Sequence, residues 1–416
     1  MPACGLDFGT SNTTLGTMVA GAPRLAPLEG EHVTVPSAIF FGWSGEPIIG
    51  RAAMDAYAEG TSGRLMRSLK SVLGTSLAEE TTQLGRRRLR FHEVISLFVS
   101  QVKARGEAAH GMSFDAVVHG RPVHFVDNNP DGDRKAEDML RLIAREAGFR
   151  DISFQYEPIA AALDYERTLK REEIALIADI GGGTSDFSIV RLSPKRHKKT
   201  ERADDILAND GIRIGGVDFD RMLSLARIMP LLGFGSPTTR KGRDVPGGHY
   251  HDLATWANIN RLYNDKTRRE LREIRRDALQ PELIDRMAHV LDREMGHNLA
   301  VLIEEAKIDL SQQDAVRIDL SEVEDNLVSA FTRADFAQDT SRPALRIGER
   351  IAHCLTMAGL KETDISSLFL TGGTTRIAHV RHEITRHLPD ARIVEGDTFG
   401  AVGAGLTIEA ARRYGA

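Results

Sequence analysis

The stretches Leu6–Asn12 (LDFGTSN) and Ile177–Asp186 (IADIGGGTSD) decide the fold, because they repeat one pattern at two distant places in the chain. In each stretch an apolar run rich in β-forming residues contains an Asp, and a sharp glycine turn follows. β-Forming residues resume at Leu15–Val19 and Phe187–Val190, so we predict two β-hairpins. Because glycine has no Cβ, the N–H groups of such turns can approach a phosphate closely. The two hairpins therefore predict a phosphate clamp that closes from two sides.

A third glycine turn lies in Leu368–Arg376 (LFLTGGTTR), which we interpret as a strand, a Gly-Gly turn and the start of a helix. The free N–H groups at a helix N-terminus suit a phosphate or a nucleotide. One such turn alone is an ordinary tight turn. Three of them in this order, two with Asp residues, indicate a nucleotide site.

These motifs resemble those of the actin-like ATPase superfamily, and within it the nucleotide-binding domain of DnaK-type heat-shock chaperones. The segments that carry the resemblance are Gly5–Thr10, Tyr156–Leu163, Asp179–Asp186, Arg213–Asp220, Glu304–Ser311 and Thr371–Arg376. Three further segments resemble the YegD-type branch of that family, namely Gly120–Phe125, Ala147–Asp151 and Met229–Gly233. The motifs run from residue 5 to about residue 405, so the resemblance covers nearly the whole chain.

The resemblance implies an α/β fold, with duplicated actin-like ATPase (ribonuclease H-like) lobes and two inserted subdomains around a central nucleotide cleft. We expect lobe I at residues 1–170, with an inserted subdomain at about 41–112. Lobe II is expected at 171–380, with an inserted helical subdomain at about 226–340. Residues 381–416 are expected to return to lobe I.

Strands and helices alternate through the middle of lobe I, as this fold requires. The expected elements are a strand at Phe114–His119, a helix at about Arg134–Gly148, a strand near Ile152–Gln155 and a helix at about Pro158–Leu169.

The composition of the 416 residues is that of an ordinary globular protein, with 41% hydrophobic and 27% charged residues. The net charge of −5 gives no sign of a nucleic-acid partner. We expect no membrane partner, since the chain has no run of about 18 apolar residues. The first motif begins at residue 5, which leaves no room for a signal peptide, and two cysteines fit a reducing environment. These observations together predict a cytoplasmic protein.

Asp7 and Asp179 are the expected metal ligands. A carboxylate cannot bind a phosphate directly, but it can hold a cation that bridges the phosphates. Magnesium loses its water reluctantly, so we expect these carboxylates to hold it through its waters. Asp186 is a third acid of the second hairpin. Together with Thr184 it is expected to orient the attacking water or to hold a monovalent cation such as potassium, unless it only caps its own turn.

The resemblance also implies the roles of the residues around the phosphates. Lys70 would reach the γ-phosphate, and Glu157 would lie at the water shell of the metal, near the hydrolytic water. Thr10 and Thr184 would donate to the β- and γ-phosphates. The other residues expected to bind the nucleotide in the glycine turns are Gly9, Ser11, Asn12, Gly181, Gly182, Gly183, Gly215, Gly216, Gly372, Gly373 and Thr374.

Glu304, Lys307 and Ser311 are spaced i, i+3 and i+7, so we expect them on one face of a helix. A charged amphipathic surface is the simple explanation. The resemblance implies that this face packs over adenine and ribose, with Lys307 bonded to the ribose. Arg376 would lie against the adenine ring.

The expected function is that of an ATP-binding and ADP-binding protein, a slow magnesium-dependent ATPase that switches an unknown protein partner. The chain stops about 15 residues after Asp397–Ala401, so we expect it to lack the peptide-binding domain of a DnaK-type chaperone. A monomer is favoured. Two alternatives stay open, a sugar-kinase-type phosphotransferase, which would need an acceptor hydroxyl and a carboxylate base, and an actin-like filament protein.

The segment Gly233–Gly248 contains two prolines and five glycines and is longer than expected at this point of a DnaK-type domain. Such a composition is typical of a loop. It could serve either as a flexible surface loop or as a partner-contact site.

Overall fold

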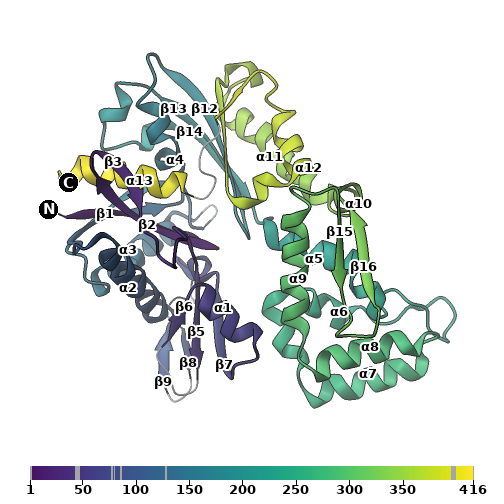
Figure 1. Cartoon of the computed structure of the whole chain (residues 1–416). Helices are drawn as coiled ribbons and strands as arrows, with labels where there is room; N and C mark the ends of the chain where they lie inside the picture. Colours follow the sequence, from purple (N-terminus) through teal and green to yellow (C-terminus); the bar gives the residue numbers. More distant parts are fainter. Residues whose placement is uncertain are drawn as a thin grey trace. The chain divides into compact units, whose positions relative to one another are not determined.

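The computed structural model describes residues 2–42, 47–75, 78, 80–84, 87–126, 129–394 and 400–415. They form two compact units, which we describe each by itself (Figure 1). Unit 1 consists of Met1–Arg213, Glu349–Thr375 and Thr385–Ala416, and unit 2 of Ile214–Gly348 and Arg376–Ile384.

Unit 1 contains a first large sheet with the strand order β11-β10-β1-β2-β3, in which β4 also pairs with β2. Its strands are β1 (Ala3–Phe8), β2 (Asn12–Val19), β3 (Ala22–Leu25), β4 (Val35–Pro36), β10 (Ala116–Arg121) and β11 (Asp151–Tyr156). β1 and β2 form the first predicted hairpin, while β10 runs parallel to β1.

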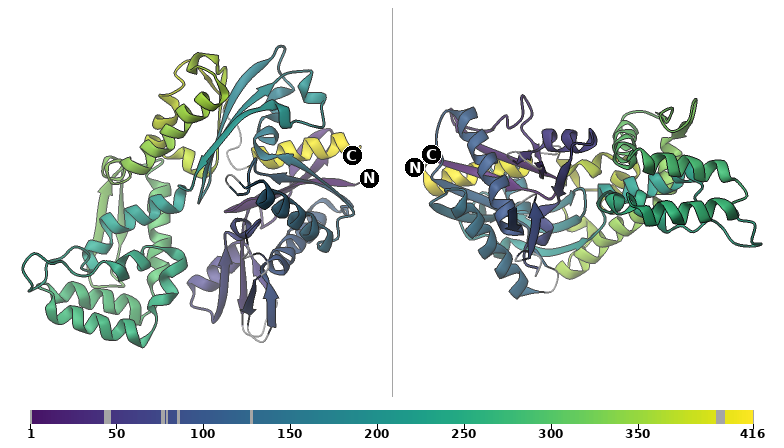
Figure 2. Two further views of the ribbon diagram at one scale, coloured as in Figure 1. Left: turned by 180° about the vertical axis from the view of Figure 1, so that it is seen from behind. Right: turned by 90° about the horizontal axis from the view of Figure 1, so that it is seen from below.

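Helices cover both faces of this sheet. Successive side chains of a strand point to opposite faces, and β1 has apolar side chains on both faces that pack against helices. Leu6 and Phe8 pack on one face, in the cluster that includes residues of α2 (Phe91–His110) and α3 (Pro130–Glu146). Ala3 packs on the other face against Leu406 of α13 (Ala401–Tyr414). The C-terminal helix thus lies along the strands of the first sheet, as both Figure 1 and Figure 2 show.

The second large sheet of unit 1 has the order β14-β13-β12-β17-β18. Its strands are β12 (Glu173–Ile180), β13 (Ser185–Leu192), β14 (Ile206–Ile212), β17 (Ser367–Thr371) and β18 (Arg392–Val394). It repeats the first sheet, since β12 forms a hairpin with β13 and pairs in parallel with β17. α4 (Glu157–Glu166) packs on it through Ile159 and Leu163.

A smaller part of unit 1 contains short strands, one short α-helix and a 3₁₀ turn that carries Lys70. Its elements are β5 (Ala38–Gly42), β6 (Ile48–Ile49), α1 (Arg51–Ala58), β7 (Gly63–Arg67), the 3₁₀ turn η1 (Leu69–Val72), β8 (Thr81–Leu84) and β9 (Arg87–Arg90).

Unit 2 is mainly helical, and in it α5 packs on α9 and α7 on α8. Its elements are α5 (Gly216–Arg227), α6 (Gly248–Leu253), α7 (Asp265–Asp277), α8 (Pro281–Asp292), α9 (Gly296–Asp309), β15 (Ala315–Asp319), β16 (Val328–Thr332) and α10 (Arg333–Asp339). α11 (Ser341–Ala358) and α12 (Ala378–Thr385) each contribute residues to both units.

The predicted fold class is confirmed as α/β, with the hairpin sheet present twice. The predicted lobe boundaries stay a prediction. Among the described residues, no helix combines the length and apolar character needed to cross a membrane.

Candidate functional site

The two predicted glycine hairpins have the same turn geometry. The N–H of Gly9 donates to the carbonyl of Asn12 at 3.0 Å, and the N–H of Gly181 donates to the carbonyl of Thr184 at 3.0 Å. The turns also lie against each other, since a Cβ built on Gly182 would come within 2.2 Å of Ser11 Oγ. A side chain at position 182 would require the Ser11 hydroxyl to rotate away, so glycine allows the two turns to approach closely as they are.

The third glycine turn is attached to the second hairpin. Gly372 has φ of 79°, and a Cβ on it would come within 2.2 Å of the carbonyl oxygen of Ile180. Thr374 Oγ1 donates to the carbonyl of Gly181 at 2.9 Å. After this turn the chain forms a 3₁₀ turn, η8 (Gly373–Arg376), before α12 begins, so the α-helix starts later than predicted.

Asp7, Asp179 and Asp186 form a group of mutually repelling carboxylates in unit 1. Burial, together with the charges of Glu157 and Asp179, raises the pKa of Asp7 to about 7. Burial and the Glu157 charge raise the pKa of Asp179 to about 6. Burial and Asp179 raise the pKa of Asp186 to about 7, although its side chain is open to solvent, and water weakens such effects. A cation would relieve this repulsion.

Lys70 and Glu157 form an ion pair beside these carboxylates. Lys70 Nζ lies 2.6 Å from Glu157 Oε1, and the two side chains are only 10% and 14% exposed. Burial alone would lower the pKa of Lys70, but the charges of Glu157 and Asp7 outweigh it, and the pKa is raised. The ammonium therefore stays charged at neutral pH, and the structure brings together two residues that are 87 positions apart.

The positions of these two side chains follow from local structure. Lys70 lies in η1, whose neighbouring residue Leu69 is buried in the core and fixes the turn. Glu157 is the first residue of α4 and Pro158 the second, where the fixed φ of proline suits a helix start. A carboxylate in the first turn is also favoured by the helix dipole.

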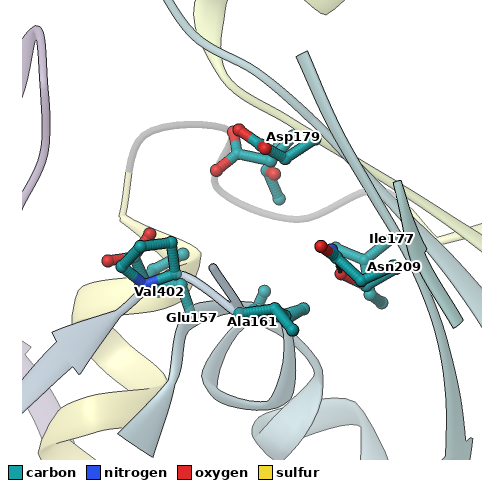
Figure 3. A pocket seen from close by; sticks show the side chains of 12 residues that line it. Glu157, Ala161, Ile177, Asp179, Asn209 and Val402 are labelled. Atoms are coloured by element: carbon teal, nitrogen blue, oxygen red, sulfur yellow. Dashed lines mark hydrogen bonds between the residues drawn. The ribbon is translucent and has the colours of Figure 1, made fainter. Parts of the chain in front are cut away.

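A small cavity lies behind the carboxylates, with a volume of about 30 Å³. Figure 3 shows that Asp179 and Glu157 reach it from opposite sides, while Ile177 and Asn209 line another side. This volume is enough for about two water molecules. Water in this place would have carboxylate, amide and hydroxyl partners.

The carboxylates fit a hydrated magnesium ion better than a directly bound metal. Among the described residues, no group of three His, Cys, Asp or Glu side chains has the geometry to hold a metal ion directly. Two hairpin Asp residues with crowded charges suit a cation that keeps most of its waters.

Two residues of this region were not among the predicted site residues. Thr371 lies opposite Asp179 in the parallel pairing of β12 and β17, and its hydroxyl bond lowers the pKa of Asp179. Asn209 lines the cavity from β14. The sequence carries a signal for Thr371, because it ends a strand immediately before a glycine turn, as the hairpin acids do. No comparable signal marks Asn209.

Unit 2 holds the remaining predicted nucleotide residues. Gly215 precedes α5 and Gly216 begins it, while Glu304 and Lys307 lie on α9. Lys307 Nζ lies 2.8 Å from Asp220 Oδ2 and joins the two helices. Arg376 also belongs to this unit.

One expectation about this group is wrong. Ser311 does not continue the helix face of Lys307, because α9 ends at Asp309. Its hydroxyl donates to the carbonyl of Ile308 at 2.6 Å, in the turn that follows the helix.

The carboxylate group predicts an unusual pH dependence of stability in the absence of metal. An Asp whose pKa is raised by folding stabilises the folded state below its unfolded pKa, and this contribution is lost as the pH rises through the folded value. Asp7→Asn should therefore raise the melting temperature clearly more at about pH 8 than at about pH 5. Calorimetry with a chelator present measures the melting temperature of both proteins at each pH. An equal shift at the two pH values would contradict the raised pKa of Asp7.

Comparison with known proteins shows which proteins this chain resembles in sequence. The family model described as Hsp70 protein matches residues 282–411. The chaperone protein HscA of Salmonella typhimurium is 26% identical over 429 residues, and the alignment covers 98% of this chain and 58% of that protein. The chaperone protein DnaK of Thermoplasma volcanium is 25% identical, over 98% of this chain and 57% of its own length.

The chain therefore spans somewhat more than half the length of these relatives. The YegD-type branch stays a prediction. The resemblance inferred from the glycine motifs is confirmed as a similarity, since the chain resembles the chaperones HscA and DnaK over nearly its whole length and the Hsp70 family model over residues 282–411.

Proposed function

We propose that this chain binds ATP with magnesium and hydrolyses it slowly to ADP and phosphate, and that the change of nucleotide switches a protein partner. The contact between the two hairpin turns at Gly182 and Ser11, with Asp7 and Asp179 on those hairpins, carries the proposal. The homology to HscA and DnaK supports it.

In this proposal the glycine turns hold the phosphates. Backbone N–H groups of the two hairpins, including that of Thr184, would donate to phosphate oxygens together with the hydroxyl of Thr10. Asp7 and Asp179 would hold the waters of a magnesium ion, which neutralises phosphate charge when it is bound. Asp186 accepts a bond from Thr184 at 2.9 Å, so this pair could orient the attacking water or hold potassium.

Lys70 and Glu157 would act on the reacting group. The ammonium of Lys70 is a compact positive charge that can stabilise negative charge on the γ-phosphate. Glu157, held by Lys70, would orient the water for attack. Phosphoryl transfer depends mostly on such positioning and charge neutralisation.

In the same proposal the residues of unit 2 bind the nucleoside. Glu304 and Lys307 of α9, with Arg376, would contact adenine and ribose, and Gly215 and Gly216 would leave space beside α5. The partner would be a protein rather than a nucleic acid or a membrane, and the compartment the cytoplasm.

Phosphate release separates this proposal from the kinase alternative. With ATP and magnesium as the only additions, the purified chain should release inorganic phosphate at a slow, steady rate. A sugar kinase needs an acceptor hydroxyl, so its ATP consumption should depend on added sugar. Phosphate release that starts only when a sugar is added would contradict the proposal.

ATP with magnesium should also stabilise the fold. A ligand that binds only the folded state adds about 2.7 kcal/mol at a concentration of 100 times Kd. The melting temperature should rise with ATP and magnesium, and much less with ATP and a chelator. An equal rise with CTP would contradict a nucleotide site that recognises adenine.

A further inference from the structure

The Gly233–Gly248 segment is a braced hairpin rather than an open loop. Its two arms are joined by a bridge between Pro237 and Asp244. The N–H of Thr238 donates to the carbonyl of Arg243 at 2.9 Å, which closes the tip. Backbone bonds of this kind fix the direction in which the tip residues point.

This hairpin is attached to the C-terminal end of α7, with which it lies in unit 2 (Figure 2). The N–H of Thr239 donates to the carbonyl of Asp277 at 2.7 Å. The N–H of Leu279 donates to the carbonyl of Pro237 at 3.1 Å. The hairpin is therefore held beside the C-terminal end of α7.

Exposed basic side chains occur on both the helix and the hairpin. On α7, the three exposed residues Arg269, Arg272 and Arg276 are spaced i, i+3 and i+7, so they lie on one helix face. Within the described part of the chain their guanidinium groups have no carboxylate partner, whereas Arg268 and Arg275 pair with α8. The hairpin adds three exposed basic residues, Arg240, Lys241 and Arg243, of which Arg240 is paired with Asp277 at 2.9 Å. We call these six residues the α7 basic surface.

An exposed apolar residue adjoins the α7 basic surface. Leu279 follows α7 by two positions, and it is 58% exposed, the largest value among the exposed large apolar side chains described. Protein interfaces combine apolar anchors with arginine, while lysine is depleted there. Five of the six basic residues are arginines, which matches that composition.

The chemistry favours an acidic protein segment over a nucleic acid. Leu279 offers an apolar contact that a protein segment can make and a phosphate backbone cannot. None of the exposed large apolar side chains described is aromatic, so none of them offers a ring on which a base could stack.

We propose that the α7 basic surface, with Leu279 beside it, is a docking site for an acidic segment of a partner protein that carries an apolar residue. The inference is independent of the proposed ATPase, because none of these residues is among those assigned to the nucleotide. Opposite charges across such an interface would speed association and select the partner.

Binding of a fluorescent probe peptide, a run of glutamates with two central leucines, tests the site. The wild-type chain should bind it with an affinity that falls as salt is added. The double variant Arg272→Glu/Arg276→Glu should weaken binding about tenfold, because two attractions become repulsions. A matched control is Lys135→Glu/Arg145→Glu, which changes the charge equally at two exposed positions of α3. Leu279→Ser should weaken binding of this peptide but not of an all-glutamate peptide.

Equal weakening in both double variants would overturn the proposal, because it would reveal a general charge effect. Failure of the wild type to bind the peptide would also overturn it, as would equal or tighter binding of an oligothymidine of the same charge. The variant Arg272→Gln/Arg276→Gln, which leaves no new charge at the end of the helix, should weaken binding to a smaller extent. ATP hydrolysis should be unchanged in all these variants, so a failed docking test leaves the ATPase proposal standing.

Discussion

Replacing Asp179 by asparagine is expected to lower ATP hydrolysis by about 10²-fold or more, the scale of losing one preorganised electrostatic group. Asparagine keeps the shape of the side chain but removes the charge that would hold the waters of magnesium. Steady-state phosphate release, measured at saturating ATP and magnesium, gives the change in kcat.

The folding of this variant is not expected to limit the test. The pKa of Asp179 is raised to about 6 by burial and by the charge of Glu157. Loss of the Asp179 charge therefore removes a buried, repelled carboxylate and should stabilise the metal-free protein. Asp164→Asn is a suitable control, because that side chain is 75% exposed on α4. Hydrolysis at the wild-type rate in folded Asp179→Asn protein would disprove the metal assignment.

Lys70→Ala and Glu157→Gln are expected to lower kcat by about 10²-fold with nearly unchanged nucleotide affinity. Their proposed contacts involve the γ-phosphate and the attacking water, so they matter most during phosphoryl transfer. The two side chains form a pair at 2.6 Å, and the double variant should therefore lose less than the product of the two single effects. ADP affinity measures the effect on nucleotide binding, and single-turnover hydrolysis measures the effect on the chemical step.

The pair Lys103 and Glu107 offers a matched control for these variants. It has the same N–O distance of 2.6 Å and similar exposure, 13% and 25%, but it lies on α2. Lys103→Ala should leave kcat unchanged. If Lys70→Ala also retained its full kcat, Lys70 would be an ordinary structural lysine.

The sequence predicts the hairpin sheets well, because their signal is local. The alternation of β-forming residues and the glycine turns mark β1, β2, β12 and β13 directly. The helix expected at about Arg134–Gly148 is α3, which begins four residues earlier, at Pro130. Asn129 accepts a bond from the N–H of Gly132 and so caps it. The sequence carries both signals of this helix start, the asparagine cap and the proline in the first turn.

Features that depend on long-range contacts could not be predicted from spacing. Thr371 reaches Asp179 only because β17 pairs with β12 in one particular register. The i, i+3, i+7 pattern continues to Ser311 and so does not reveal that α9 ends at Asp309. The Gly233–Gly248 segment has a loop composition, and its bracing comes from backbone bonds to Asp277 and Leu279 that composition does not encode.

Calorimetric titration of ATP into the chain, with magnesium and then with a chelator, tests the central claim most directly. The claim is that two glycine hairpins hold a nucleotide through a cation at Asp7 and Asp179. We predict one ATP site with magnesium and a much weaker one, or none, with the chelator. Equal ATP affinity with and without magnesium would contradict the claim, and so would an absence of ATP binding under both conditions.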